Sequence, residues 1–246
     1  MKRAIFALSF FGLVFCLSLT PVSAQDDAAQ KALEGIKYWN KWIEARGGKD
    51  RLSKVTSYKS TADAKILSQG LNLTIITYKK GLNKYRIDQK VMGMTITQAL
   101  NGDTGWITNP QTGFATDMPA EVKGQMGAPA NEHEALLDPI QFGHKVTYEG
   151  RQTIDGKEYI MLNQTAPNGV VCTQYIDAET FLRYKYKFAS NNVDTEVFES
   201  DYRNVDGIKV PFLSRQAQNG KDVAIITTTE FVYNTNLDDS LFAKPQ

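Results

Sequence analysis

Few residues of this 246-residue sequence combine the types and spacing that chemistry requires. Its two histidines are His133 and His144, and Glu132 and Glu134 flank the first of them. A metal site needs three or four converging ligands, so further ligands would have to come from elsewhere in the chain. Neighbouring glutamates in a loop are usually solvated, and we therefore expect no metal at this position.

The remaining polar motifs do not form a catalytic set either. The sequence has no G-x-S-x-G turn, no glycine-rich phosphate loop, no C-x-x-C pair and no H-E-x-x-H motif. Asp238 and Asp239 form a carboxylate pair, but their position just before Leu241 and Phe242 favours capping of a turn. The sequence predicts neither an enzyme nor a cofactor.

The first 24 residues have the pattern of an export signal. Lys2 and Arg3 give a basic start, residues 5–19 form an apolar run, and residues 22–24 offer small side chains for cleavage. The run is too short and too poorly flanked for a stable membrane span. We expect export and cleavage after Ala24.

The two cysteines raise two separate questions, lipidation and disulfide formation. A lipoprotein signal at Cys16 is the alternative, but the large Phe15 stands where a lipobox needs a small residue. Cleavage after residue 24 leaves Cys172 alone, so no internal disulfide can form. We interpret Cys172 as a small buried hydrophobe, because a reactive thiol would need a neighbouring base.

Charge and length limit the partners and the number of domains. Cleavage would remove Lys2 and Arg3, which leaves 28 − 2 = 26 basic and 27 acidic side chains and a net charge of −1. Nucleic-acid binding requires a basic face, so this balance argues against a nucleic-acid partner. With 42% hydrophobic residues the chain can bury one substantial core, and we expect residues 25–246 to form a single domain.

The segment after the predicted cleavage site has the pattern of an amphipathic helix. Asp26 and Asp27 can cap it, and Gly47 can end it after Arg46. We expect this helix to pack on a sheet, although Trp42 could instead touch cargo or a membrane surface. Its predicted buried stripe consists of Ala29, Ala32, Leu33, Ile36, Trp39, Asn40 and Ile43.

From Val55 onward the apolar period changes to two, which predicts β-strands. In the strand at 181–188, for example, Arg183, Lys185 and Lys187 are predicted on the polar face. The pattern gives about ten or eleven antiparallel strands, and a sheet of that size must curl or close. Tight two-residue hairpins are predicted at Asp155-Gly156, Asn168-Gly169 and Asn219-Gly220.

The strand pattern breaks down between residues 117 and 144, where two short helices are predicted near 121–125 and 132–137. Such a segment is either an ordinary connection or a movable cover. Loops longer than about a dozen residues are often functional, and the flanking meander would otherwise leave its apolar face partly uncovered. We therefore expect a lid, whose apolar residues are Met118, Val122 and Met126.

One set of alternating apolar residues could line a binding groove. Flexible methionines beside branched aliphatic residues suit a ligand of irregular shape. The simpler interpretation of each single residue is an ordinary core position, so the binding prediction concerns the face as a whole. The predicted face consists of Trp39, Leu71, Leu73, Ile75, Met92, Met94, Ile96 and Leu100.

Six segments span most of the chain after the predicted signal. In order they are GGKDRLSKVTSYKS (47–60), YKKGLNKYRID (78–88), NGDTGWITNPQTG (101–113), YIDAETFLRYKYKF (175–188), DYRNVDGIKVPF (201–212) and NTNLDDSLFAKP (234–245). Taken together and in this order, they resemble the LolA-like outer-membrane lipoprotein-sorting family of the bacterial periplasm. The resemblance implies an α+β fold in which an incomplete antiparallel β-barrel wraps around the N-terminal helix, with a short helical lid.

The resemblance also implies a function. It predicts a monomeric periplasmic carrier that takes acyl chains of lipoproteins, or other lipids, from an inner-membrane donor complex to an outer-membrane receptor. A sensor or interaction domain of the same fold, recognising lipoproteins or a membrane partner, is the alternative. The residues themselves argue only for an apolar groove.

Overall fold

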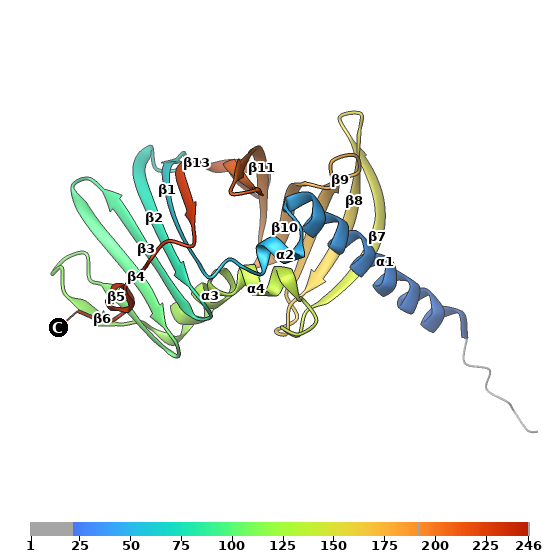
Figure 1. The fold of residues 1–246 in the computed structure, drawn as a ribbon. Helices are drawn as coiled ribbons and strands as arrows, with labels where there is room; N and C mark the ends of the chain where they lie inside the picture. Colours follow the sequence, from blue (N-terminus) through green and yellow to red (C-terminus); the bar gives the residue numbers. More distant parts are fainter. Residues whose placement is uncertain (1–21, 191, 246) are drawn as a thin grey trace, which may run out of the picture.

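The computed structural model describes residues 22–190 and 192–245, in which several helices accompany one large antiparallel sheet (Figure 1). Within these residues no helix is both long and apolar enough to cross a membrane. The helices are α1 (Val22–Arg46), α2 (Lys49–Leu52), α3 (Ala120–Ala130), α4 (Glu132–Leu137) and the 3-10 helix η1 (Asp239–Leu241).

The sheet has thirteen strands in the described part of the chain, in the order β6-β5-β4-β3-β2-β1-β13-β12-β11-β10-β9-β8-β7. Because β6 and β7 remain free edges, the sheet curves without closing, and the predicted α+β class with an incomplete barrel is confirmed. The strands are β1 (Ser57–Ile66), β2 (Leu71–Lys80), β3 (Lys84–Val91), β4 (Met94–Asn101), β5 (Thr104–Thr108), β6 (Ala115–Asp117), β7 (Lys145–Ile154), β8 (Lys157–Thr165), β9 (Val171–Asp177), β10 (Arg183–Ser190), β11 (Val193–Val205), β12 (Ile208–Gln218) and β13 (Lys221–Tyr233).

The strand count exceeds the predicted ten or eleven partly because short strands escape a periodicity analysis. β6 has only three residues, too few to show an alternation. Two of the predicted hairpins form as expected, since both residues of Asp155-Gly156 and of Asn219-Gly220 have positive φ. The third is wrong: residues 166–170 form a longer loop, in which the Asn168 side chain accepts a hydrogen bond from the Val170 amide.

Helix α1 ends where predicted but starts earlier. Gly47 and Gly48 both have positive φ, and the Gly48 amide donates to the Ile43 carbonyl, which closes the last turn. The helix begins at Val22, so the predicted capping residues Asp26 and Asp27 lie inside it rather than at its start. The buried stripe is also shorter than predicted, because the first turns extend past the sheet edge and Leu33 is 70% exposed.

One glycine lets α1 approach the sheet closely. A Cβ atom on Gly35 would lie 2.7 Å from the Val146 carbonyl oxygen of β7, a distance that side chains do not tolerate. One turn further on, Trp39 is buried, and its Nε1 donates to the Leu136 carbonyl of α4 over 2.8 Å. Helix α1 therefore covers one end of the sheet, against β7, β8 and β12.

All core clusters that involve helices lie on the same face of the sheet, here called the inner face. Directly paired residues of neighbouring antiparallel strands point to the same side, so the register defines this face from β4 to β7. At one end α1 and α4 pack on it around Trp39, Trp42 and Ile160. At the other end α3 packs on Tyr85 and Leu100.

The opposite face of β3 to β5 is covered by the C-terminal segment. Trp106 Nε1 donates to the Phe242 carbonyl over 2.9 Å, and Phe242 is fully buried. Asp238 caps η1 by accepting from the Ser240 amide, as the sequence predicts. Asp239 forms ion pairs with lysines of β2 and β3. The carboxylate pair thus has a structural role.

Candidate functional site

A pocket of about 200 Å³ lies where α1, α3 and α4 meet the inner face of the sheet. Helix α1 contributes Trp42 and Arg46, and β1 and β13 contribute the rings of Tyr58, Phe231 and Tyr233. Residues of α4, β10, β11 and β12 complete the wall. The lining is therefore a mixture of aromatic and polar side chains, unlike the aliphatic groove that the sequence predicts.

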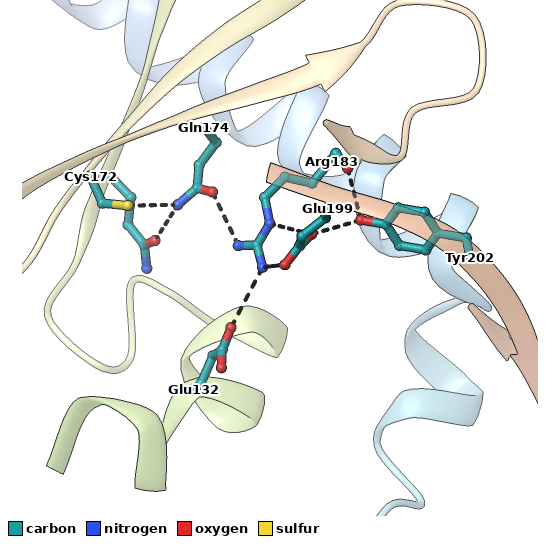
Figure 2. A network of polar contacts seen from close by, with 7 residues as sticks. Glu132, Cys172, Gln174, Arg183, Glu199 and Tyr202 are labelled. Carbon is teal, nitrogen blue, oxygen red and sulfur yellow. Dashed lines mark hydrogen bonds and ion pairs between the residues drawn. The ribbon is translucent and has the colours of Figure 1, made fainter. Parts of the chain in front are cut away.

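A buried ion pair forms the side of the pocket at β10 and β11. Arg183 Nε donates to Glu199 Oε2 over 2.8 Å, and Arg183 Nη2 donates to Glu199 Oε1 (Figure 2). The two side chains are 10% and 8% exposed. This bidentate arrangement is the geometry in which a guanidinium binds a carboxylate most strongly.

Three neighbours extend this pair into a network that reaches α4 (Figure 2). The Tyr202 hydroxyl lies 2.7 Å from Glu199 Oε2 and 2.8 Å from the Arg183 carbonyl oxygen. Gln174 Oε1 accepts from Arg183 Nη1 over 3.2 Å. Glu132, at the start of α4, lies 3.8 Å from Arg183 Nη2. The network thereby links the helical segment to the sheet.

The electrostatics of the network keep both members of the pair charged. Burial alone would raise the pKa of Glu199, but the adjacent Arg183 guanidinium outweighs burial and holds that pKa below its usual range. Burial likewise opposes the charge of Arg183, whose pKa is nevertheless raised because Glu199 faces it. Burial raises the pKa of the Tyr202 hydroxyl, which therefore stays protonated.

Two donors that line the pocket have no partner within the described residues. They are Nε1 of Trp42, a residue only 2% exposed, and Nε of Arg46. Among residues 22–190 and 192–245, Arg46 also forms no ion pair. A buried donor without an acceptor costs about 1–3 kcal/mol, so these two N–H groups are hydrogen-bond donors that no other described residue uses.

Helix α4 is held in place by two further polar contacts. Lys79, 4% exposed, pairs with Glu134 over 2.7 Å. His133 Nε2 lies 3.0 Å from the Leu52 carbonyl oxygen, and burial lowers the pKa of its imidazole, so the neutral ring donates there. These contacts fix α4 above the pocket.

The two histidines and the cysteine that the sequence analysis considered do not come together in one site. His144 contacts Gln164 rather than His133, and the described residues contain no group of three potential metal ligands. Cys172 is half-buried beside Gln174, and burial raises the pKa of its thiol to about 11, which keeps it protonated and unreactive.

Six of the eight predicted groove residues share the inner face near β2 and β4. The register shows this: Ile75 lies opposite Gln89, and Gln89 lies opposite Ile96. Most are half-buried, Met94 is 48% exposed, and Leu100 is buried under α3. They do not line the pocket of about 200 Å³. The six are Leu71, Leu73, Ile75, Met94, Ile96 and Leu100.

The other two predicted residues lie elsewhere. Trp39 is 1% exposed and belongs to the core under α1, where its neighbour Trp42 is the residue that reaches the pocket. Met92 is not on a strand: Val91 pairs with Met94, so Met92 forms the hairpin turn with positive φ and is 79% exposed. The tight turn at Met92 and Gly93 takes the Met92 side chain off the face.

The predicted lid residues pack on the inner face. Met118 and Met126 are buried against Tyr85 and Leu100, and Val122 packs beside them. The segment contains two helices, α3 and α4, close to the predicted ones. It connects β6 with β7, the two edges of the open sheet, and crosses the concave side between them (Figure 1).

Sequence reasoning missed the charged residues of the pocket. Arg183 was predicted on the polar face with Lys185 and Lys187, but an irregularity between Arg183 and Lys185 turns its side chain to the inner face. Glu199 and Tyr202 lie on β11, and Asp201 between them has positive φ, which departs from regular strand geometry. The two-residue period along the chain does not reveal either distortion, because it assumes a regular strand.

Comparison with known proteins shows which solved structures have a similar fold. No protein-family model and no curated protein matches the sequence. Solved structures do match, over 85–87% of this chain and 97% of each of theirs. They include a domain named for outer membrane lipoprotein sorting from Vibrio parahaemolyticus (12% identity, TM-score 0.61), a DUF1329 family protein from Desulfovibrio piger (16%, 0.60) and a LolA superfamily protein from Nitrosomonas europaea (14%, 0.59).

These likenesses cover most of the chain and agree with the open, helix-covered sheet described above. The fold of this protein is therefore LolA-like, as the sequence resemblance implies. At 12–16% identity the similarity concerns the fold alone.

Proposed function

We propose that this protein is a carrier that binds acyl chains of lipoproteins, or of other lipids, and transfers them through the periplasm toward the outer membrane. The observation that carries the proposal is the unclosed sheet with half-buried aliphatic residues on its inner face, next to helices that cover the rest of that face. The LolA-like fold, shared with a domain named for lipoprotein sorting, supports it.

In this proposal the acyl chain lies along the face formed by Leu71, Leu73, Ile75, Met94 and Ile96. Helix α3 acts as the lid. Its Met126 and the preceding Met118, which now pack on the sheet, move aside so that hydrocarbon can take their place. Methionine suits this exchange because its side chain is flexible and polarizable.

Transfer of hydrocarbon through water is energetically reasonable for such a site. Each buried methylene contributes about 0.8 kcal/mol, so a chain of about 14 methylenes gains roughly 11 kcal/mol in a bilayer or in a dry groove. If the groove is as apolar and as dry as a bilayer, the acyl chain has nearly the same free energy in both. Direction then comes from the donor and the acceptor, and the carrier needs neither a nucleotide nor catalysis.

The proposal includes the cellular setting predicted from the sequence. Residues 1–21 lie outside the described residues, and cleavage after Ala24 stays a prediction. The partners we propose are an inner-membrane donor complex, an outer-membrane receptor and the acyl chains themselves. We propose that the carrier acts as a monomer.

Native mass spectrometry of the protein, extracted gently from the periplasm of an expressing bacterium, tests the function. We expect a population whose added mass corresponds to lipid or acylated peptide, released on organic extraction. The matched control is the same protein after extraction and refolding, which should take up a fluorescent fatty acid in proportion to the lipid removed.

A protein that is empty as extracted and takes up no fatty acid would contradict the carrier function. The same fold would then act as a sensor or interaction domain, and capture of a lipoprotein or membrane protein without its lipid would be the corresponding result.

A further inference from the structure

The pocket beneath α1 and α4 differs chemically from the aliphatic face near β2 and β4. Two of its lining residues, Trp42 and Arg46, carry buried N–H groups, Nε1–H and Nε–H, that have no acceptor among the described residues. Trp39, three residues before Trp42, has its indole donor paired with the Leu136 carbonyl. Two tryptophans of the same helix thus differ: the indole N–H of Trp39 has an acceptor, and that of Trp42, which lines the pocket, has none.

Among the charges around the pocket, Arg46 is the cation without a carboxylate partner in the described residues; its guanidinium lies beside the Tyr233 hydroxyl, and its Nε–H has no acceptor. Arg183 is neutralised by Glu199, and Glu132, which is 67% exposed, lies beside the same guanidinium. His133 is neutral, and burial raises the pKa values of Tyr58, Tyr202 and Tyr233, so these hydroxyls carry no charge. An oxygen acceptor with negative or partial negative charge fits beside Arg46 and Trp42.

The size of the pocket fits a polar head and excludes a whole lipid. The pocket of about 200 Å³ has room for a head group of several non-hydrogen atoms. Sites for complete drug-sized ligands have about 300–1,000 Å³. The aliphatic residues of β2 and β4 continue the same inner face on the far side of β1, where a hydrocarbon chain can extend.

We propose that this pocket binds the acyl oxygens at the head of the cargo, with Trp42 Nε1–H and the Arg46 guanidinium as donors. The acceptor is the carboxylate of a fatty acid or the ester carbonyl of an acylglycerol group. The inference rests on the proposed carrier function and adds the polar half of its ligand. In this proposal the ligand binds in one direction, with its acyl head under α1 and its hydrocarbon chain toward β2 and β4.

Calorimetric titration of the delipidated protein with three ligands of equal chain length tests the proposal. The probes are palmitate, monopalmitoylglycerol and hexadecyltrimethylammonium, whose head has no acceptor oxygen. We expect Trp42→Phe and Arg46→Met each to weaken binding of an acyl ligand by about tenfold or more, the effect of losing a charge-assisted or buried hydrogen bond. Binding of the ammonium probe should change less than threefold.

Two variants on the outer side of the molecule serve as matched controls. Trp106→Phe removes an indole whose Nε1 is already paired with the Phe242 carbonyl, and Arg215→Met removes a guanidinium paired with Asp222. Both should leave all three affinities unchanged. Circular dichroism and thermal unfolding check the fold, and Arg46→Met carries the test if Trp42→Phe does not fold.

The outcomes distinguish a free carboxylate from an ester carbonyl as the ligand, and the polar-head pocket from the carrier function. Weakening confined to palmitate supports the pocket with a free carboxylate as its ligand; equal weakening of both acyl ligands supports it with the acyl carbonyl. Unchanged affinities in both pocket variants, with wild-type binding intact, overturn the polar-head pocket and leave the carrier function standing. A wild-type protein that binds none of the three probes overturns the carrier function itself.

Discussion

At the scale of single residues, the Arg183–Glu199 pair is the strongest charged feature of the inner face. Both side chains are nearly buried, and Tyr202 and Gln174 complete their hydrogen bonds. Removing two charges from water costs several kcal/mol, which only excellent geometry offsets. Once the pair exists, losing one partner strands a charge in a poorly solvated site.

This argument predicts a marked asymmetry between single and double variants. Arg183→Met and Glu199→Gln should each lower the free energy of unfolding by about 3–5 kcal/mol, while the double variant Arg183→Met/Glu199→Gln should lose less than the sum. Urea denaturation measures all three. Additive losses would mean that the two charges are stabilised separately and not by each other.

The same pair predicts the pH dependence of stability. The pKa of Glu199 is lower in the folded protein than in the unfolded chain, so its contribution is complete above the unfolded pKa of about 4.3 and is lost as the pH falls through the folded value. Denaturation at pH 7 and pH 3 should therefore show the Glu199→Gln deficit shrinking in acid. An equal deficit at both pH values would contradict this.

At the scale of elements, the contact between α1 and β7 depends on a missing side chain. The sequence predicts the helix and its glycine stop, but its first residues and its true buried positions depend on where the sheet ends. Gly35 is buried within a helix, where local propensity disfavours glycine. Its presence is explained by the close approach to the Val146 carbonyl, which no local pattern reveals.

Substitution of this glycine by alanine should therefore distinguish the effect of the close α1–β7 contact from the intrinsic preference of helices for alanine. Gly35→Ala is expected to destabilise the protein by about 1–3 kcal/mol, because the helix must move away from β7. Gly124→Ala in α3, where a Cβ would meet open space, should instead stabilise by about 0.5–1 kcal/mol. Chemical unfolding compares the two; a stabilising Gly35→Ala would refute the close approach.

At the scale of the whole molecule, an open sheet with one covered face can both fold and keep space for a guest. Helices α1 and α4 close one end of the inner face around tryptophans, and α3 closes the other around methionines. Between them lies the pocket of about 200 Å³, bordered by the network of Figure 2. The proposed cargo would exchange with side chains at the methionine end.

Charge placed on alternate residues of β2 tests the carrier function at this scale. Ile75 faces inward with Ala62 and Gln89, whereas Ile76 faces outward with Thr61 and Asp88, and both are half-buried. We expect Ile75→Asp to reduce uptake of a fluorescent fatty acid at least tenfold, because a carboxylate on the hydrocarbon path is costly. Ile76→Asp should retain uptake.

Far-ultraviolet circular dichroism controls for loss of fold in both variants. If uptake falls equally in both while the spectra stay native, the inner face of β2 is not the hydrocarbon path.

The sequence by itself determined the classes of element and the side of each strand that is apolar. The two-residue period, the dipeptide turns and the glycine stop of α1 are local properties of the backbone, so the LolA-like α+β fold could be inferred from them together with the resemblance. The single-face arrangement of Ile75, Ile96 and Leu100 follows from the same alternation.

Only the tertiary structure decided which residues form the pocket. Arg183 faces inward because of a strand irregularity, Met92 is lost to a turn, and Trp42 rather than Trp39 reaches the cavity. The first two depend on how neighbouring strands pair, and the third depends on how α1 packs against the sheet and α4. Burial and unpaired donors are properties of three-dimensional packing, which periodicity along the chain does not encode.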